Sequence, residues 1–387
     1  MYRSVELFSG AGGLALGLAA AGFHHEVLVE WNSTAYQTLL HNKRANFRPV
    51  KSWNIVQADA RDFEFSSIEK EIDLVAGGPP CQPFSLGGKH KGYDDKRDMF
   101  PVAIEAVRIL HPKIFIFENV KGLLRSSFKS YLQYISLQLS YPYLKKKENE
   151  KWEEHLSRLE DHHTAGHFSK EGYRTVIRLL NAADYGVPQK RERIFIVGFR
   201  NDLCAEWSFP KPTHSEDSLI WAKWVTGKYW EEHQILKKDQ PKPTSTELIQ
   251  VERLVEKYGM FSPIMERWRT VRDAISYLPK KVMNHELRDG ARLYPGHTGS
   301  EIDQPSKTLK AGDHGVPGGE NMVRYYDNSV RYFSVRESCR IQTFPDEFYI
   351  SGSWTEGMRQ IGNAVPVKLA ETVGYSIRQQ LETASSS

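Results

Sequence analysis

The sequence has few cysteines, no long hydrophobic run and little excess of charge of one sign. Its 387 residues include 3 cysteines, which are too few and too scattered for a disulfide framework or a zinc site. No apolar run approaches the roughly 18 residues that a membrane span requires. A formal net charge of +4 permits a polyanionic partner without demanding one. These absences exclude a disulfide-stapled or membrane-spanning protein and indicate a reducing compartment, the cytoplasm.

Alternating strand and helix patterns fill the first half of the chain. The length is sufficient for a good core and predicts two domains. A strand begins almost at the N-terminus, which leaves no room for a signal peptide. The alternation predicts an α/β fold with a doubly wound, mostly parallel sheet. The predicted strands cover residues 5–8, 27–29, 55–58, 72–76, 114–117, 173–179 and 193–199.

Beyond about Cys204 the alternation stops, and turn residues and tryptophans become frequent. We therefore predict one domain from residues 1–203 with 337–387, and a smaller, irregular domain from residues 204–336. The charged segment 145–167 is expected to be a solvated helical insertion. Its histidines at positions 162, 163 and 167 lack cysteine or acidic ligands at a recognised spacing, so no metal is expected.

The most informative stretch is residues 77–85, with the sequence GGPPCQPFS. It follows the apolar run 72–76, which is typical of a buried strand ended by glycine and proline. Two consecutive prolines restrict the backbone and make the turn stiff. A free cysteine is most often a small buried hydrophobe, but Cys81 at this turn stands where an α/β enzyme displays a nucleophile.

Four polar side chains directly follow predicted strands: Glu30, Asp59, Cys81 and Glu118. The carboxyl ends of parallel strands share one edge of the sheet, and ligands bind there. Any one of these acids alone is most simply a loop carboxylate or a helix cap. Four polar groups at equivalent positions indicate a site.

The turn after the first strand is close to the dinucleotide-binding fingerprint. Gly10, Gly12 and Ala15 follow the glycine pattern, and Glu30 lies at the distance of a ribose-binding acid. Glycines let a ligand approach the backbone, and the acid accepts hydrogen bonds from ribose hydroxyls. The pattern indicates an adenosine cofactor without saying which one, and no residues suited to hydride transfer follow it.

Taken together, the motifs resemble those of the cytosine-5 DNA methyltransferases, in the family's order and over nearly the whole chain. They lie at residues 6–13 (ELFSGAGG), 30–31 (EW), 59 (D), 79–82 (PPCQ), 118–120 (ENV), 189–193 (QKRER), 336–340 (RESCR) with 344–345 (FP), and 360–366 (QIGNAVP). Cys339 stands where the family more often has alanine, and the charged insertion lengthens a usually shorter connection. Neither departure affects the chemistry.

The resemblance implies a Rossmann-like domain that binds S-adenosyl-L-methionine, with a target-recognition domain inserted into it. The implied catalytic residues are Cys81, Glu118, Arg191 and Arg193. The implied cofactor-binding residues are Phe8, Ser9, Gly10, Ala11, Gly13, Glu30, Trp31, Asp59, Ala60, Gly78, Pro80, Met99, Asn363 and Ala364. The expected DNA-binding residues are Gln82, Ser85, Lys89, Lys91, Thr308 and Lys310.

The residue types suit this chemistry on physical grounds. Carbon 5 of cytosine is a poor nucleophile, and adding the Cys81 thiolate at carbon 6 places electron density on it. Glu118 is suited to hold a proton at ring nitrogen 3, and Arg193 to stabilise charge on the carbonyl oxygen. Arg191 and Arg193 share a strand face by their spacing, which favours the pocket over a surface ion pair with Glu192.

A base inside a duplex cannot reach Cys81, so the cytosine must be flipped out of the helix. Residues 85–93 carry hinge glycines and basic residues, and we expect a mobile lid there rather than an ordinary exposed loop. The implied partner is duplex DNA and no membrane. A monomer suffices, and the chain resembles bacterial modification enzymes that act alongside a restriction endonuclease without a stable complex.

Three alternatives remain open from the sequence. A branch of the family uses the same motifs on tRNA, although the sizeable second domain favours DNA. A catalytically silent DNA-binding relative would not need the intact thiol, acid and arginines. A nicotinamide-dependent oxidoreductase is the most distant alternative. Methyl incorporation into duplex DNA and tRNA tests the first alternative, covalent trapping on DNA tests the second, and calorimetry of cofactor binding tests the third.

Overall fold

The computed structural model describes residues 1–80, 98–167, 169–279, 282–312 and 321–384. The chain forms two compact units. Unit 1 contains Met1–Leu180, Glu192–Pro210 and Ala370–Ser387, and unit 2 contains Asn181–Arg191 and Lys211–Leu369. Residues 337–369 therefore pack with unit 2, although the sequence suggested that they return to the first domain. The assignment of target recognition to residues 204–336 stays a prediction.

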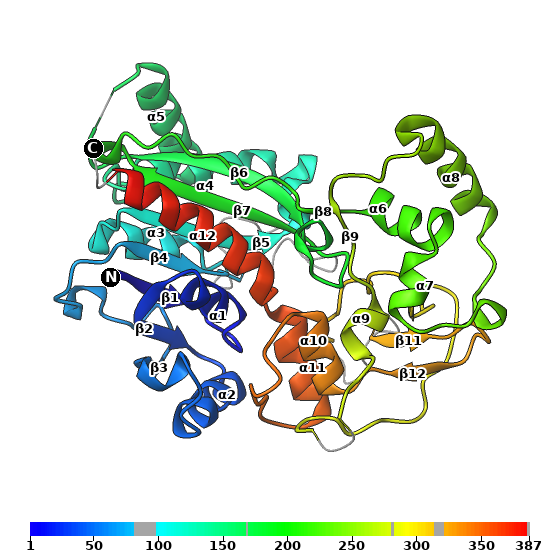
Figure 1. Ribbon diagram of the computed structural model, residues 1–387. Coiled ribbons are helices and arrows are strands. Elements are labelled where there is room, and N and C mark those ends of the chain that lie inside the picture. Colours follow the sequence, from blue (N-terminus) through cyan, green and yellow to red (C-terminus); the bar gives the residue numbers. More distant parts are fainter. Residues whose placement is uncertain (81–97, 168, 280–281, 313–320, 385–387) are drawn as a thin grey trace. The chain divides into compact units, whose positions relative to one another are not determined.

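Unit 1 is built on a seven-stranded sheet (Figure 1). Its order is β3-β2-β1-β4-β5-β7-β6, with the first five strands parallel and β7 antiparallel to β5. The prediction of a mostly parallel, doubly wound sheet is confirmed. The strands are β1 (Tyr2–Leu7), β2 (Phe23–Glu30), β3 (Ile55–Gln57), β4 (Leu74–Gly77), β5 (Ile114–Val120), β6 (Tyr173–Asn181) and β7 (Glu192–Arg200).

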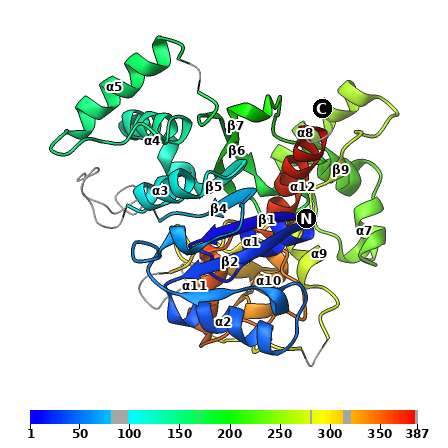
Figure 2. The ribbon, with the colours of Figure 1, turned by 90° about the vertical axis from the view of Figure 1, so that its left-hand side faces the viewer.

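Helices cover both faces of this sheet (Figure 2). Side chains alternate along β1, so Val5 and Leu7 enter the large core with Phe100 of α3, while Ser4 faces the side of α1. Helix α12 packs closely on α1 at Gly374. A Cβ there would lie only 2.9 Å from Leu18 Cδ2, so glycine permits this close contact. The helices are α1 (Gly13–Ala20), α2 (Ser33–Arg44), α3 (Phe100–Leu110), α4 (Lys129–Ser140), α5 (Trp152–Thr164) and α12 (Val367–Ala384).

Buried polar groups anchor α1 to the sheet. Ser4 Oγ lies 2.9 Å from His25 Nδ1, and His25 Nε2 lies 2.9 Å from the carbonyl oxygen of Ala15. A carbonyl can only accept, so Nε2 carries the proton and Nδ1 accepts from the serine. Burial lowers the pKa of His25 to about 4, which keeps the ring neutral and this arrangement intact at physiological pH.

The charged insertion contains α5, which confirms its helical character. Its buried face sets Leu159 against Tyr134 of α4. His163 and His162 lie 2.7 and 3.0 Å from the hydroxyls of Tyr141 and Tyr143. In the described part of the chain, no group of three or more histidine, cysteine or acidic residues is placed to hold a metal. None of the described helices is long and apolar enough to cross a membrane.

Unit 2 combines short helices with two small sheets. Tyr229, Trp230 and Trp268 form a core with Leu219, so the tryptophans that mark this region in the sequence serve packing. The strands are β8 (His214–Ser215), β9 (Glu266–Arg267), β10 (Ser300–Glu301), β11 (Met322–Arg324) and β12 (Val330–Tyr332). The helices are α6 (Glu216–Ile220), α7 (Lys228–Glu232), α8 (Ser245–Tyr258), α9 (Val271–Ile275), α10 (Val335–Ile341) and α11 (Trp354–Asn363).

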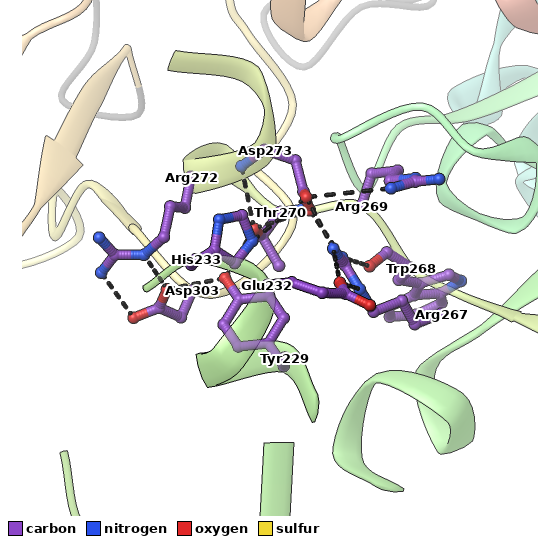
Figure 3. A network of polar contacts seen from close by, with 10 residues as sticks. All are labelled: Tyr229, Glu232, His233, Arg267, Trp268, Arg269, Thr270, Arg272, Asp273 and Asp303. Atoms are coloured by element: carbon purple, nitrogen blue, oxygen red, sulfur yellow. Dashed lines mark hydrogen bonds and ion pairs between the residues drawn. The ribbon is translucent and has the colours of Figure 1, made fainter. Parts of the chain in front are cut away.

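Two aspartates, the buried Asp303 and the half-buried Asp273, join segments of unit 2 (Figure 3). Asp303 accepts from Arg272 Nε at 2.5 Å and Nη2 at 3.1 Å, and from the Tyr229 hydroxyl at 2.7 Å. Asp273 accepts two bonds of 2.8 Å from Arg267 and one of 2.7 Å from the Thr270 amide, which caps α9. Paired bonds of this kind compensate the cost of burying each charge.

Replacing Asp303 with asparagine should lower the free energy of unfolding of unit 2 by about 3–5 kcal/mol, because it leaves the mostly buried Arg272 guanidinium without its ion-pair partner. Burial alone would raise the pKa of Asp303, but the hydrogen bond and charge of Arg272 outweigh it and lower the pKa. The stabilisation is therefore present above about pH 4, the ordinary aspartate pKa, and is lost as the pH falls further. Denaturant unfolding followed by tryptophan fluorescence at several pH values measures both effects.

Asp327→Asn is the control, since Asp327 is an exposed acid of the same unit whose partner is Ser329 rather than an arginine. It should unfold like the wild type. Equal stability of both variants would contradict a stabilising role for the buried pair.

Candidate active site

The glycine turn after β1 is shaped for close approach of a ligand. Gly10 and Gly12 adopt φ values of +53° and +84°, which favour glycine. A Cβ on Gly12 would lie 2.8 Å from Leu39 Cδ2, so this glycine packs against α2. A Cβ on Gly10 would meet nothing within 4 Å, so the space beside Gly10 is open. One glycine thus serves packing, and the other borders open space.

Glu30, the last residue of β2, holds this turn. Its Oε2 accepts from the Gly10 amide and its Oε1 from the Asn32 amide, both at 2.6 Å. Burial raises the pKa of Glu30, and these two amide bonds oppose that shift. Each oxygen keeps a lone pair for a further donor such as a ribose hydroxyl. The next residue, Trp31, is 72% exposed and offers a free aromatic surface.

Asp59 lies just beyond β3, and a neighbouring arginine engages it. Arg61 Nε donates to Asp59 Oδ1 at 3.0 Å, and this bond lowers the pKa of Asp59. The carboxylate is therefore charged and suited to accept from an amine. Ala60, beside it, is buried in the core. Arg61 was not predicted as a site residue, although its contact with Asp59 is local, only two residues away in the chain.

The Pro79–Pro80 turn is tied to two neighbouring elements. Asn119 Nδ2 donates to the Pro79 carbonyl at 2.9 Å, and the Met99 amide donates to the Pro80 carbonyl at 3.1 Å. Gly77 has no room for a side chain, since a Cβ would lie 2.6 Å from the Leu7 carbonyl oxygen. The residue before the predicted nucleophile is therefore fixed by β5 and by the start of α3. This role of Asn119 was not predicted.

Cys81 itself lies outside the described residues. The same holds for four predicted DNA contacts and for the expected lid at residues 85–93. These four contacts are Gln82, Ser85, Lys89 and Lys91. Their assignments stay predictions.

Glu118 and Arg193 form an ion pair between β5 and β7. Arg193 Nε lies 2.8 Å from Glu118 Oε1, and the side chains are only 13% and 9% exposed. The antiparallel register pairs Glu118 with Phe195 and Val120 with Arg193, so the two charged residues are diagonal neighbours. Glu118 therefore lies within β5 rather than just after it, because pairing with β7 extends the strand to Val120. A Cβ on Gly78 would be 3.4 Å from Glu118 Oε2, which places the acid beside the turn that leads to Cys81.

Arg191 has a different setting from the one expected. It belongs to unit 2, is fully buried, and donates from Nη2 to the Gly362 carbonyl at 2.7 Å and from Nη1 to the Leu309 carbonyl at 3.2 Å. These bonds are made with backbone carbonyls rather than with Glu118. The local spacing predicted that Arg191 would share a face with Arg193, but β7 begins only at Glu192. The catalytic role that the resemblance implies for Arg191 stays a prediction.

The remaining predicted site residues of unit 2 lie on two segments. Thr308 donates from Oγ1 to the Lys190 carbonyl at 2.8 Å, and Lys310 is exposed. Asn363 ends α11 with an exposed side chain, and Ala364 follows it at the C-cap. Unit 1 holds the other described cofactor candidates, from Phe8 to Met99.

Alkylation of the native protein with iodoacetamide at about pH 8 should modify Cys204 and spare Cys339. Cys204 is exposed, whereas Cys339 is fully buried in α10. Burial raises the pKa of Cys339 to about 12, so almost no thiolate forms there. Mass spectrometry of the tryptic peptides measures both, and equal labelling rates would contradict the buried placement. Unfolding in guanidinium is the positive control, because it should make Cys339 reactive.

The sheet order, the glycine turn and the polar groups at the strand ends define a Rossmann-like α/β enzyme fold. Comparison with known families then gives the family. The model of the family described as C-5 cytosine-specific DNA methylase matches residues 2–141 and 154–379. The chain belongs to this family, which confirms the enzyme class expected from the sequence, DNA (cytosine-5-)-methyltransferase.

Curated relatives cover nearly the whole chain. The Type II methyltransferase M.PspPI of Psychrobacter sp. (strain TA137) is 34% identical over 392 residues, which cover 99% of this chain and 80% of the relative. The Type II methyltransferase M.Eco47II of Escherichia coli is 32% identical over 394 residues, with the same coverage. M.NgoMIV of Neisseria gonorrhoeae, also a Type II methyltransferase, is 31% identical over 390 residues, which cover 98% of this chain and 98% of the relative.

Solved structures share the fold. A putative DNA modification methyltransferase from an E. coli prophage has a TM-score of 0.58 at 20% identity, covering 99% of this chain and 100% of that one. The S. pombe Dnmt2 methyltransferase has a TM-score of 0.55 at 18% identity, covering 99% of both. At these identities the likeness concerns the fold alone.

Proposed function

We propose that the protein transfers a methyl group from S-adenosyl-L-methionine to carbon 5 of cytosine within a specific duplex DNA sequence. The reaction proceeds through a covalent bond between Cys81 and a cytosine flipped out of the helix. The Glu118–Arg193 pair carries this proposal, because it sets a buried acid and a cation beside the turn that leads to Cys81.

The residues at the glycine turn suit the proposed cofactor. S-adenosyl-L-methionine supplies an electrophilic methyl group when bound. The open space beside Gly10 admits a ligand to the backbone, and Glu30 retains acceptor capacity for ribose hydroxyls. Trp31 offers an aromatic face to a purine, and Asp59 a carboxylate to its amine. We propose the same role for the other predicted cofactor contacts: Phe8, Ser9, Ala11, Gly13, Ala60, Gly78, Pro80, Met99, Asn363 and Ala364.

The chain's own groups would act on the base in sequence. The Cys81 thiolate bonds to carbon 6, and the electron pair of the ring double bond moves to carbon 5. Glu118 holds a proton at ring nitrogen 3, and Arg193 stabilises the carbonyl oxygen. After carbon 5 takes the methyl group, its proton leaves to a base. The carbon–sulfur bond then breaks, and the thiolate is released.

Duplex DNA is the proposed substrate, and base flipping gives the thiolate access to the ring. Thr308 and Lys310 are proposed to contact the phosphate backbone, together with Gln82, Ser85, Lys89 and Lys91. We place the protein in the bacterial cytoplasm as a monomeric modification enzyme. There it protects DNA from a restriction endonuclease of the same system.

Covalent trapping on DNA that contains 5-fluorocytosine tests the proposal. Fluorine at carbon 5 blocks the final elimination, so wild-type protein should form a complex that survives denaturing electrophoresis. Cys81→Ala should form none. Cys204→Ala removes an exposed cysteine and is the control, which should trap like the wild type. Equal trapping by Cys81→Ala and the wild type would refute the mechanism, and preferential methylation of tRNA would refute the substrate.

A further inference from the structure

Arg191 is a fully buried arginine that joins three segments of unit 2. Its guanidinium donates to the carbonyls of Leu309 and Gly362, which lie 118 and 171 residues further along the chain. A guanidinium is planar and presents its donors in a fixed fork, so two acceptors bound to one fork hold a defined relative position. The side chain therefore fixes the 309 segment against the end of α11.

The 306–309 segment also lies along residues 188–190. The Lys190 amide donates to the Ser306 carbonyl at 2.8 Å, and the Ser306 amide donates to the Pro188 carbonyl at 2.9 Å. The Leu309 amide donates to Gln189 Oε1 at 3.0 Å. With the Thr308 hydroxyl on the Lys190 carbonyl, these bonds hold the segment along its whole length.

The end of α11 contacts the same segment directly. A Cβ on Gly362 would lie 2.4 Å from the Ala311 amide nitrogen and 2.6 Å from the Lys310 carbonyl carbon. A side chain there would force the two backbones apart. The contact is therefore between backbones, and Arg191 bonds to both sides of it.

The geometry assigns Arg191 as a positioning residue that couples two binding segments, residues 308–310 and 362–364. This inference rests on the proposed function, in which Thr308 and Lys310 contact DNA while Asn363 and Ala364 contact the cofactor. Ordering of either segment by its ligand restrains the other through the shared guanidinium. Binding of DNA should then tighten binding of the cofactor, and the reverse must hold to the same factor.

Calorimetry of S-adenosylhomocysteine binding, with and without duplex DNA that contains the recognition sequence of the enzyme, measures this coupling. Bisulfite sequencing of DNA from cells that express the protein identifies the site. In the wild type, DNA should lower the Kd for S-adenosylhomocysteine by about 5–150-fold, the usual range for coupled sites. In Arg191→Lys, which cannot bridge two carbonyls with one planar group, the factor should fall to about 2 or less.

Arg336→Lys is the matched control. Arg336 is equally buried in unit 2 and donates to the carbonyls of Met283, Pro345 and Phe348, none of which lies in the two segments. Both variants should melt at lower temperature, but only Arg191→Lys should lose the coupling. Wild-type coupling in Arg191→Lys, equal loss in Arg336→Lys, or no coupling in the wild type would overturn the inference. A wild type that binds no S-adenosylhomocysteine and methylates no DNA would instead refute the proposed function.

Hydrogen exchange on the wild type tests the same point without a substitution. S-adenosylhomocysteine alone should slow exchange of the Leu309 and Lys310 amides, which donate to Gln189 and Asn321. DNA alone should slow exchange of the Ala364 amide, which donates to the Gln360 carbonyl. Protection confined to the segment that contacts each ligand would overturn the inference even if Arg191→Lys did not fold.

Discussion

Replacing Glu118 with glutamine should lower kcat about 10²–10⁴-fold, the usual contribution of a positioned acid or base. Glutamine keeps the size and the acceptor oxygen of glutamate, so it can still bond to Arg193 Nε, which lies 2.8 Å from the carboxylate. It cannot carry the proton that ring nitrogen 3 requires. The Kd for the cofactor should change little, because Glu30 rather than Glu118 borders the glycine turn.

Single-turnover methylation of duplex DNA measures this effect free of product release. Glu192→Gln is the control, since Glu192 neighbours Arg193 but directs its exposed carboxylate to Lys121 at 2.6 Å. An exposed pair of this kind contributes only about 0–1 kcal/mol, so kcat should stay within about twofold of the wild type. If Glu118→Gln kept wild-type kcat, the acid would have no part in the chemistry.

The Glu118–Arg193 pair should also act as one unit. Arg193→Lys should reduce kcat by about 10²-fold, in the range seen when one donor to a developing oxyanion is removed. The double variant should be little worse than the worse single variant, because each substitution already disrupts the shared geometry. Full additivity of the two effects would show that the residues work independently.

Replacing Glu30 with alanine should raise the Kd for S-adenosylhomocysteine about 10–100-fold. The carboxylate accepts from the Gly10 and Asn32 amides at 2.6 Å each, and its loss both frees the turn and removes an acceptor for the ribose. Hydrogen bonds to charged groups contribute about 1.5–3 kcal/mol each, which is consistent with a change of this size. Calorimetry on the variant and the wild type measures it directly.

The pH dependence gives a second readout for Glu30. Burial raises the pKa of this carboxyl, so protonation begins at a higher pH than in a free glutamate. As the pH is lowered, the wild type should therefore start to lose cofactor affinity while the pH is still above about 4.3, the ordinary glutamate pKa. Glu30→Gln should bind more weakly and show no such decline. Glu26→Gln, on the same strand with Arg3 and Lys70 as partners, is the control and should match the wild type. An unchanged Kd in Glu30→Ala would remove this residue from the cofactor site.

The sheet could be predicted from the sequence because its signal is local. Strands β1, β2, β4 and β5 overlap the apolar runs that predicted them, although β2 begins four residues earlier and β5 ends three residues later than the pattern indicated. The family assignment was equally accessible, since it rests on short motifs such as PPCQ and QKRER in a fixed order. The candidate acids Glu30 and Glu118 followed from their positions after the predicted strands, although Glu118 lies within β5 in the structure.

The pairing of those residues could not be read from the sequence. Glu118 meets Arg193 only because β7 runs antiparallel to β5 in one particular register. The spacing of Arg191 and Arg193 suggested one shared face, but the strand starts between them and the two arginines belong to different units. The assignment of residues 337–369 to unit 2 likewise follows from packing between segments that are distant in the sequence.

The sequence by itself determined the enzyme family, the mostly parallel sheet and the candidate catalytic groups, since each depends on residue type and short-range pattern. Only the tertiary structure decided that Arg193 pairs with Glu118 and that Arg191 bonds to backbone carbonyls. The reason is physical: a guanidinium bonds to whatever acceptors folding brings within about 3 Å. For Arg191 those acceptors lie more than a hundred residues away in the chain.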